Sequence, residues 1–222
     1  MHKLQQEVDM SVRTVNHKVG EDEYVDLSSL DFDKLKAAFA KSNNKNAVVF
    51  DLQEAIEKQL KQMVQQNPIR LEFYEKYQKI IAEYNDGKDL QAVQKTFDDF
   101  NEFIRDDLTP EVERAARENL DEETMAVVDL LKKPELTAKE IESVKNVAKD
   151  TLSKLKAEKL RVERWRESTQ VTSQVQTVID DSLQYLPEEA YPDEELETKS
   201  IKLYQHIYTN YQDAGVSTYG SF

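Results

Sequence analysis

Apolar residues recur every three or four positions along most of this chain, and this spacing constrains the fold more than any other feature. Residues three or four apart share one face of an α-helix. One such stripe ends before Asn67-Pro68 and consists of Val49, Leu52, Ile56, Leu60 and Met63. Glycine and proline are scarce, with four and five residues, whereas β-hairpins need frequent glycine-containing turns. The pattern predicts an all-α fold, an irregular bundle of about seven to nine helices joined by short turns.

The expected organisation is a helical domain over residues 31–211 with a loosely ordered segment at each end. Residues 1–30 lack sustained periodicity, and residues 212–222 are mostly small or polar, with two glycines. Terminal segments of this kind are commonly poorly ordered. No repeat or low-complexity linker interrupts the helical region, so it is compatible with one domain or with two abutting sub-bundles, 31–135 and 136–211.

Two helix starts are recognisable from their capping residues. Thr137-Ala-Lys-Glu140 matches a capping box, in which the Thr and Glu side chains satisfy free backbone amides. If that helix continues to Arg166 it has about 30 residues and a length of about 45 Å. Thr109-Pro110-Glu111 predicts another start, with Thr109 as the cap and the proline in the first turn.

The composition excludes a membrane span and every site that needs cysteine. The longest apolar run, residues 47–50, has four residues, far short of the roughly 20 that a membrane span needs. The chain has no cysteine, which excludes disulfides, thiolate nucleophiles and cysteine-type zinc sites. We therefore expect a soluble, cytoplasmic protein that makes no membrane contact.

The sequence offers no motif for catalysis or for cofactor binding. The three histidines, His2, His17 and His206, have no spacing that would place metal ligands on one helical face. Four scattered glycines rule out the usual phosphate-binding loops. We therefore predict no catalytic, cofactor-binding or metal-binding residue in this segment, and His206 is expected to be an ordinary helical residue.

A group of carboxylates in one predicted helix has a simple interpretation. The group contains Asp98, Asp99, Glu102, Asp106 and Asp107. Helical geometry places Asp98 and Glu102 on one face, opposite the apolar stripe, so they are expected to face water. A solvated acidic face is favoured over a metal site.

The charge distribution singles out one tract. The chain has a formal charge of −14, yet residues 137–166 contain nine basic and five acidic side chains, and the region from Glu167 onward contains two basic and ten acidic ones. The basic tract, residues 154–166, contains six cations, two acids and the sole tryptophan. A local reversal of charge of this kind attracts either nucleic-acid phosphates or an acidic protein surface.

The candidate contact residues come from this tract and from the last predicted helix. On a continuous helix the cations would border an apolar seam around Trp165 and would not form one phosphate-tracking row. That arrangement suits a protein partner as well as DNA, although burial of Trp165 in the core is the simpler outcome. The candidates for DNA or partner contact are Lys154, Lys156, Lys159, Arg161, Arg164, Trp165 and Arg166. Tyr204 and Tyr208 are candidate partner-facing aromatic residues.

Several segments, in order, resemble the C-terminal helical region of the restriction subunit of type I restriction–modification enzymes. They are NPIRLEFYEKYQKIIAEY at 67–84, VDLLKKP at 128–134, LTAKEI at 136–141, RWR at 164–166, IDDSL at 179–183 and LYQHIY at 203–208. The similarity covers roughly residues 31–211. One departure is that Glu167-Ser-Thr-Gln170 follows the RWR segment, where the family often has basic residues.

The resemblance implies a role in assembly. Such subunits join a nuclease to an ATP-driven DNA translocase, and their helical C-terminal region docks onto the modification and specificity subunits. By this resemblance the segment is a non-catalytic domain without a cofactor, whose partners are those subunits, with double-stranded DNA as a further candidate. The alternative that the residues leave open is a free-standing helical adaptor unrelated to restriction.

Overall fold

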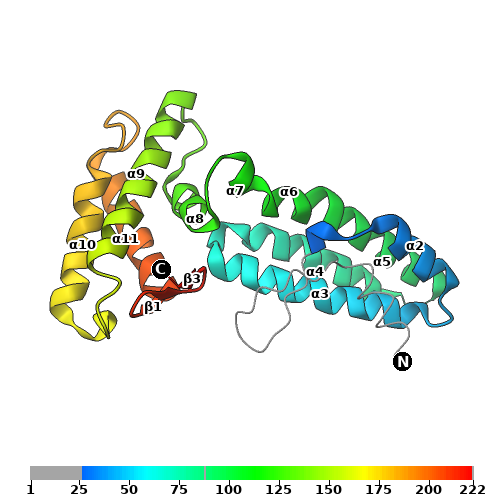
Figure 1. Ribbon diagram of the computed structural model, residues 1–222. Coiled ribbons are helices and arrows are strands. Elements are labelled where there is room, and N and C mark those ends of the chain that lie inside the picture. The colour runs from blue at the N-terminus through cyan, green and yellow to red at the C-terminus, as the bar shows by residue number, and fades with distance from the viewer. Residues whose placement is uncertain (1–26, 88, 222) are drawn as a thin grey trace. The chain divides into compact units, whose positions relative to one another are not determined.

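The computed structural model describes residues 27–87 and 89–221 and has the all-α architecture that the apolar spacing predicts (Figure 1). Within those residues, eight helices of ten residues or more carry the fold. Their bounds are α2 (Phe32–Lys41), α3 (Lys45–Gln66), α4 (Leu71–Asp86), α5 (Leu90–Glu102), α8 (Glu122–Leu131), α9 (Ala138–Glu158), α10 (Thr169–Leu183) and α11 (Asp193–Asn210). None of the helices in this described part combines the length and the apolar character needed to cross a bilayer.

Shorter elements connect the long helices. They are the 3-10 turns η1 (Leu27–Ser29), η2 (Pro68–Arg70) and η4 (Trp165–Glu167), the π-helical turn η3 (Phe103–Leu108), the single turns α6 (Thr109–Val112) and α7 (Arg114–Arg117), and the strands β1 (Tyr211–Asp213), β2 (Val216–Ser217) and β3 (Gly220–Ser221). Residues 1–26, with His2 and His17, lie outside the described residues, so the expectation for residues 1–30 falls mostly there. Of the remainder, Leu27 and Leu30 are buried.

The C-terminal segment differs from the loose tail expected for residues 212–222. The three strands pair antiparallel in the order β1-β2-β3. The Thr218 amide donates to the carbonyl oxygen of Asn210 at 2.9 Å, and the Tyr219 hydroxyl donates to the carbonyl oxygen of Gln66. These small and polar residues are ordered because distant backbone groups supply their hydrogen-bond partners, and composition alone does not reveal such partners.

The element α6 begins at Thr109 with Pro110 in its first turn, as expected, but the expected capping role of Thr109 is wrong. Thr109 has helical backbone angles, φ −60° and ψ −48°, and the chain runs through η3 directly into α6. A proline ring inside a regular α-helix clashes with the carbonyl four residues earlier, here that of Asp106. The wider π turn immediately before Pro110 relieves that clash. The chain therefore stays helical from η3 into α6, without a capped helix start at Thr109.

Chain contacts divide the protein into two compact units, and each is described by itself. The first contains the residues up to Val64 together with Arg70–Glu118, and the second contains Gln65–Ile69 together with Asn119–Phe222. The division after Glu118 lies ahead of the boundary at residue 135 considered from the sequence. The reason is that α8 packs against α9 and α11 of the second unit.

The first unit is held by an aromatic and aliphatic core. The predicted stripe of α3 is confirmed, since all five of its members, Val49 to Met63, are buried. Phe39 stacks on Phe97 with their ring centroids 3.8 Å apart, and Tyr77 stacks on Phe100. Asp98 and Glu102 are exposed, as their place opposite this core predicts.

The second unit is built around four helices. In the chain contacts α8 packs on α9, α9 on α10, α10 on α11, and α11 returns to α8. Figure 1 shows α9, α10 and α11 as neighbouring helices with the small sheet beyond the end of α11.

The capping box at the start of α9 is confirmed. The amide of Thr137 donates to a carboxylate oxygen of Glu140 at 2.7 Å, and the amide of Glu140 donates to the Thr137 hydroxyl at 3.3 Å.

The C-terminal end of α8 is capped by side chains from elsewhere in the second unit. The Lys199 ammonium of α11 donates to the carbonyl oxygens of Leu130 at 2.8 Å and Lys132 at 3.3 Å. The Tyr191 hydroxyl donates to the carbonyl oxygen between them, that of Leu131, at 2.9 Å. Terminal carbonyls of a helix lack partners within the helix and carry its negative dipole end, so a lysine is well suited to this position.

Candidate interaction surface

The helix that the capping box at Thr137 opens ends at Glu158 and does not continue to Arg166, and this break determines the geometry of the basic tract. The amides of Lys159 and Leu160 both donate to the carbonyl oxygen of Leu155, at 2.9 and 3.0 Å. Leu155, Leu160 and Trp165 are all buried. On one straight helix, residues five apart would diverge by about 140°, so these three side chains reach the core only if the helix stops.

Residues 159–168 are fastened to the C-terminal sheet by three hydrogen bonds. The carbonyl oxygen of Leu160 accepts from the amide of Gly215 at 3.1 Å. The amide of Arg164 donates to the Asp213 carboxylate, and Trp165 Nε1 donates to the carbonyl oxygen of Tyr211 at 3.2 Å. Arg164 adopts a left-handed conformation with φ 55°, which turns the chain so that the indole points inward. The tract is therefore a folded turn held to the sheet.

Trp165 is fully buried, as the simpler sequence interpretation predicts. Its ring meets Tyr208 edge to face, with centroids 5.8 Å apart. The neighbouring Arg166 donates to the carbonyl oxygen of Tyr208 at 3.3 Å, and its guanidinium carbon lies 5.7 Å from the centre of the Tyr208 ring. Tyr204 contacts Tyr208 one turn along α11, with centroids 6.0 Å apart. Trp165 thus supports Tyr208 from beneath, and Tyr208 in turn contacts Tyr204.

Lys156 has a structural role. Its ammonium lies 2.6 Å from a carboxylate oxygen of Glu123, a residue of the first turn of α8 that is only 8% exposed. The other carboxylate oxygen of Glu123 accepts from the Tyr211 hydroxyl at 2.6 Å. Burial and the nearby Glu123 charge raise the pKa of Tyr211, so the phenol stays protonated and donates. Sequence reasoning missed Glu123, and no local signal marks it.

The other cations of the tract differ in exposure. Lys159 is half-buried and pairs with Glu158, and Arg164 is exposed and pairs with Glu167. Lys154 is exposed and lies 5.9 Å from the ring centre of Tyr185. Arg161 is exposed, and within residues 27–87 and 89–221 it forms no ion pair. The tract does not form a single cationic row.

Three arginines of this turn and two tyrosines of α11 form what we call the arginine–tyrosine patch. It consists of Arg161, Arg164, Arg166, Tyr204 and Tyr208, over the buried Trp165. Arg166, Tyr204 and Tyr208 are linked by direct contacts, and Arg161 and Arg164 belong to the same turn of chain. Arginine and tyrosine combine an apolar body with polar ends, and both are enriched where proteins bind one another. The residue types of this patch are therefore those typical of a protein–protein interface.

His206 is a buried residue of α11 whose two ring nitrogens both have hydrogen-bond partners. Its Nδ1 lies 3.2 Å from Nδ2 of Asn210, and its Nε2 lies 3.1 Å from the Tyr219 hydroxyl oxygen. Since Tyr219 donates to the carbonyl oxygen of Gln66, its oxygen accepts from Nε2, and Nδ1 accepts from Asn210. Burial lowers the pKa of His206 to about 4, which keeps the ring neutral.

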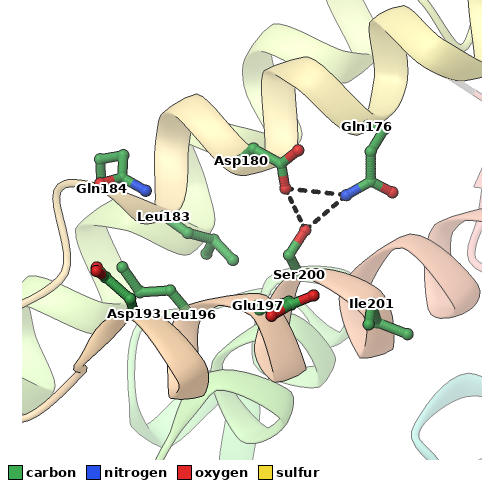
Figure 2. Close-up of a pocket in the computed structure, with 9 residues that line it drawn as sticks. All are labelled: Gln176, Asp180, Leu183, Gln184, Asp193, Leu196, Glu197, Ser200 and Ile201. Atoms are coloured by element: carbon green, nitrogen blue, oxygen red, sulfur yellow. Dashed lines mark hydrogen bonds between the residues drawn. The ribbon is translucent and has the colours of Figure 1, made fainter.

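A second feature is a hollow of about 460 Å³ between α10 and α11. Figure 2 shows Gln176 and Asp180 of α10 joined with Ser200 of α11 by hydrogen bonds at its side. The Gln176 amide nitrogen lies 2.9 Å from the carboxylate of Asp180 and 2.6 Å from the hydroxyl of Ser200, and that hydroxyl donates to Asp180. These bonds tie α10 to α11. Asp193 and Glu197 line the same hollow and make it acidic.

The carboxylates of the acidic stretch can be placed individually in the structure. No group of three or more histidine, aspartate or glutamate side chains is gathered for a metal ion in residues 27–87 and 89–221. In the acidic stretch, Asp106 pairs with Arg105 at 2.7 Å and Asp107 with Lys76. Those two carboxylates therefore serve in ion pairs.

Comparison with known protein families identifies the family of this chain. The family described as "Type I restriction enzyme HindI endonuclease subunit-like, C-terminal" matches residues 11–209. No curated protein and no solved structure matches the chain.

Proposed function

This chain belongs to the family of C-terminal domains of HindI-like type I restriction endonuclease subunits, and on that premise we propose that it is a non-catalytic assembly domain. It docks the ATP-dependent DNA translocase and endonuclease onto the methyltransferase and specificity subunits. Family membership sets aside the alternative of a helical adaptor unrelated to restriction.

The arginine–tyrosine patch is the observation that carries the docking role. Arg166 and Tyr208 hold each other in place, with the hydrogen bond and the ring contact described above, and Trp165 fixes Tyr208 from below. A preordered contact surface loses less side-chain entropy on binding than a mobile one. In a protein of formal charge −14, this local group of arginines also directs an acidic partner surface to one place.

Charge reversal tests the docking role. In the complete restriction subunit, Arg161→Glu with Arg164→Glu is expected to weaken association with the methyltransferase–specificity core by about tenfold or more, because like charges across an interface cost several kcal/mol. The measurement is affinity in the absence of DNA. The matched control is Lys139→Glu with Lys149→Glu, which makes the same charge change at exposed positions of α9 outside the patch. Equal affinities for the two double variants would reject the docking role.

Direct DNA contact is a second candidate, favoured by the exposed cations Lys154, Arg161 and Arg164. Each phosphate contact contributes roughly −0.9 to the slope of log affinity against log salt, so three contacts give about −2.7. Affinity should then fall roughly fortyfold between 50 and 200 mM salt. Binding of duplex DNA by the chain, measured across that range, tests this candidate. A slope near zero, or one that survives reversal of these three charges, would exclude it.

A further inference from the structure

Helix α11 has apolar side chains beyond those that pack into the second unit. Leu203 and Ile207 are buried, whereas Ile201 is 50% exposed and Tyr208 is 42% exposed. Steps of three and four residues place these two exposed side chains on one face of the helix, together with others of the same spacing. The set, which we call the outer stripe, is Asp193, Glu197, Ile201, Tyr204 and Tyr208.

The two ends of the outer stripe carry opposite charges. Asp193 and Glu197 form one end, where they line the acidic hollow between α10 and α11 (Figure 2). Neither forms an ion pair within residues 27–87 and 89–221. At the other end the guanidinium of Arg166 lies against Tyr208, through the hydrogen bond and the ring contact described above. The stripe is therefore negative at one end, apolar in the middle and positive at the other end.

This order of charges makes the stripe complementary to a second copy of itself. Its midpoint, between Asp193 and Tyr208, lies beside Ile201. In an antiparallel pair with a two-fold axis at Ile201, Tyr208 and the attached Arg166 come opposite Asp193 of the second copy, and the reverse contact forms at the other end. A parallel copy would instead set acid against acid and arginine against arginine, which is unfavourable. Charge complementarity thus selects both the occupant and its direction.

We propose that the outer stripe is a self-association surface on which a second copy of this chain packs antiparallel. The inference goes beyond the docking function, because it assigns Asp193 and Glu197, which lie outside the arginine–tyrosine patch. A two-fold contact of this kind uses the same residues of both copies. The stripe is only about 22 Å long, so the contact belongs with the smallest specific interfaces, and the dissociation constant is expected to be on the order of 10–100 μM.

Sedimentation of the 222-residue chain measures the pairing. At low salt, where opposite charges attract most strongly, a reversible dimer is expected at about 0.1 mM, and added salt is expected to dissociate it. A two-fold contact stops at the dimer, whereas a head-to-tail contact continues to add copies. Growth beyond the dimer with rising concentration would overturn the proposal. A chain that stays monomeric at about 1 mM would overturn it as well.

Charge reversal at either end tests the register of the pair. Asp193→Arg and Arg166→Glu each place like charges at both contacts, so each variant alone is expected to pair about a hundredfold more weakly, roughly tenfold for each contact. An equimolar mixture of the two variants is expected to pair again, because every contact then joins opposite charges. Glu135→Arg makes an acid-to-base change at an exposed loop position outside the stripe and is expected to pair like the parent. Folded variants that do not recover in the mixture would overturn the proposal.

Association of the complete restriction subunit with the modification core separates this inference from the docking role. The measurement uses nanomolar subunit, far below the concentration at which copies pair. Asp193→Arg is expected to bind the core normally, whereas Arg161→Glu with Arg164→Glu binds weakly. If Asp193→Arg weakens core binding and the chain does not pair, the core occupies the stripe, so self-association fails and docking stands. If the arginine variant binds the core normally and the mixed variants still pair, docking fails and self-association stands.

Discussion

The Tyr211 hydroxyl donates to a carboxylate oxygen of Glu123 at 2.6 Å, although the two residues are 88 positions apart. The same carboxylate receives the ammonium of Lys156 at 2.6 Å. One buried acid thus joins the start of α8, the end of α9 and strand β1. This relationship explains why a cation of the basic tract points into the second unit.

Removal of the Tyr211 hydroxyl is expected to destabilise the chain. Tyr211→Phe leaves one oxygen of a buried carboxylate without its donor, and a hydrogen bond to a charged group contributes about 1.5–3 kcal/mol. The free energy of unfolding in urea measures the loss. Tyr185→Phe is the control, since that side chain is largely exposed, and it is expected to lie within about 0.5 kcal/mol of the parent. Equal losses in the two variants would show that the Glu123 contact contributes nothing.

The lysine at the end of α8 provides a second test. Lys199→Met keeps the aliphatic stem and removes the ammonium that caps two carbonyl oxygens, so unfolding free energy is expected to fall by about 1–3 kcal/mol. Lys202→Met, an exposed position on the same helix, is expected to change it by less than about 0.5 kcal/mol. Unfolding in urea at neutral pH compares the two. A Lys199→Met variant as stable as the parent would rule out the capping role.

Acid is expected to destabilise the second unit through His206. Its pKa is lowered by burial to about 4 in the folded chain, from 6.5. Between these values the unfolded chain binds the proton and the folded chain does not, so stability falls as the pH falls through that window. From pH 7 to pH 5 the expected loss is about 2 kcal/mol. The measurement is the difference in pH dependence between the parent and His206→Gln, because carboxylates contribute equally to both. Parallel curves would contradict the assignment.

Two substitutions at Arg164 test the left-handed backbone of this turn independently of the lost side chain. With φ 55°, a residue with a Cβ atom is strained there, and glycine is not. Arg164→Gly and Arg164→Ala both lose the ion pair with Glu167, so their comparison isolates the backbone. The glycine variant is expected to melt about 2 °C or more above the alanine variant, the shift that corresponds to roughly 1 kcal/mol in a chain of this length. The reverse order would mean that the left-handed turn is not populated.

Much of the local structure is predictable because it depends on near neighbours in the sequence. The stripe of α3 is buried along its length, and the capping box at Thr137 forms as its residues imply. The outward position of Asp98 and Glu102 follows from the same periodicity.

Prediction failed where distant partners decide the conformation. The periodic pattern alone extends α9 to Arg166, but the helix ends at Glu158 because Leu160 and Trp165 reach the core by another path. The partners that stabilise this turn are Tyr211 and Asp213, 46 and 49 positions from the residues they bind. Lys156 points into the second unit because it pairs with Glu123, 33 positions away in the sequence. Local spacing contains no information about such pairs.

The sequence by itself determined the helical class, most helix positions, the charge reversal and the family, because each depends on residue type and on spacing within a few turns. The tertiary structure alone decided which cations of the basic tract stay exposed and which are partly buried against distant residues. It also decided that Trp165 supports the surface from within, and that the polar C-terminal residues form a sheet. These outcomes depend on burial and on hydrogen bonds between segments that only folding brings together.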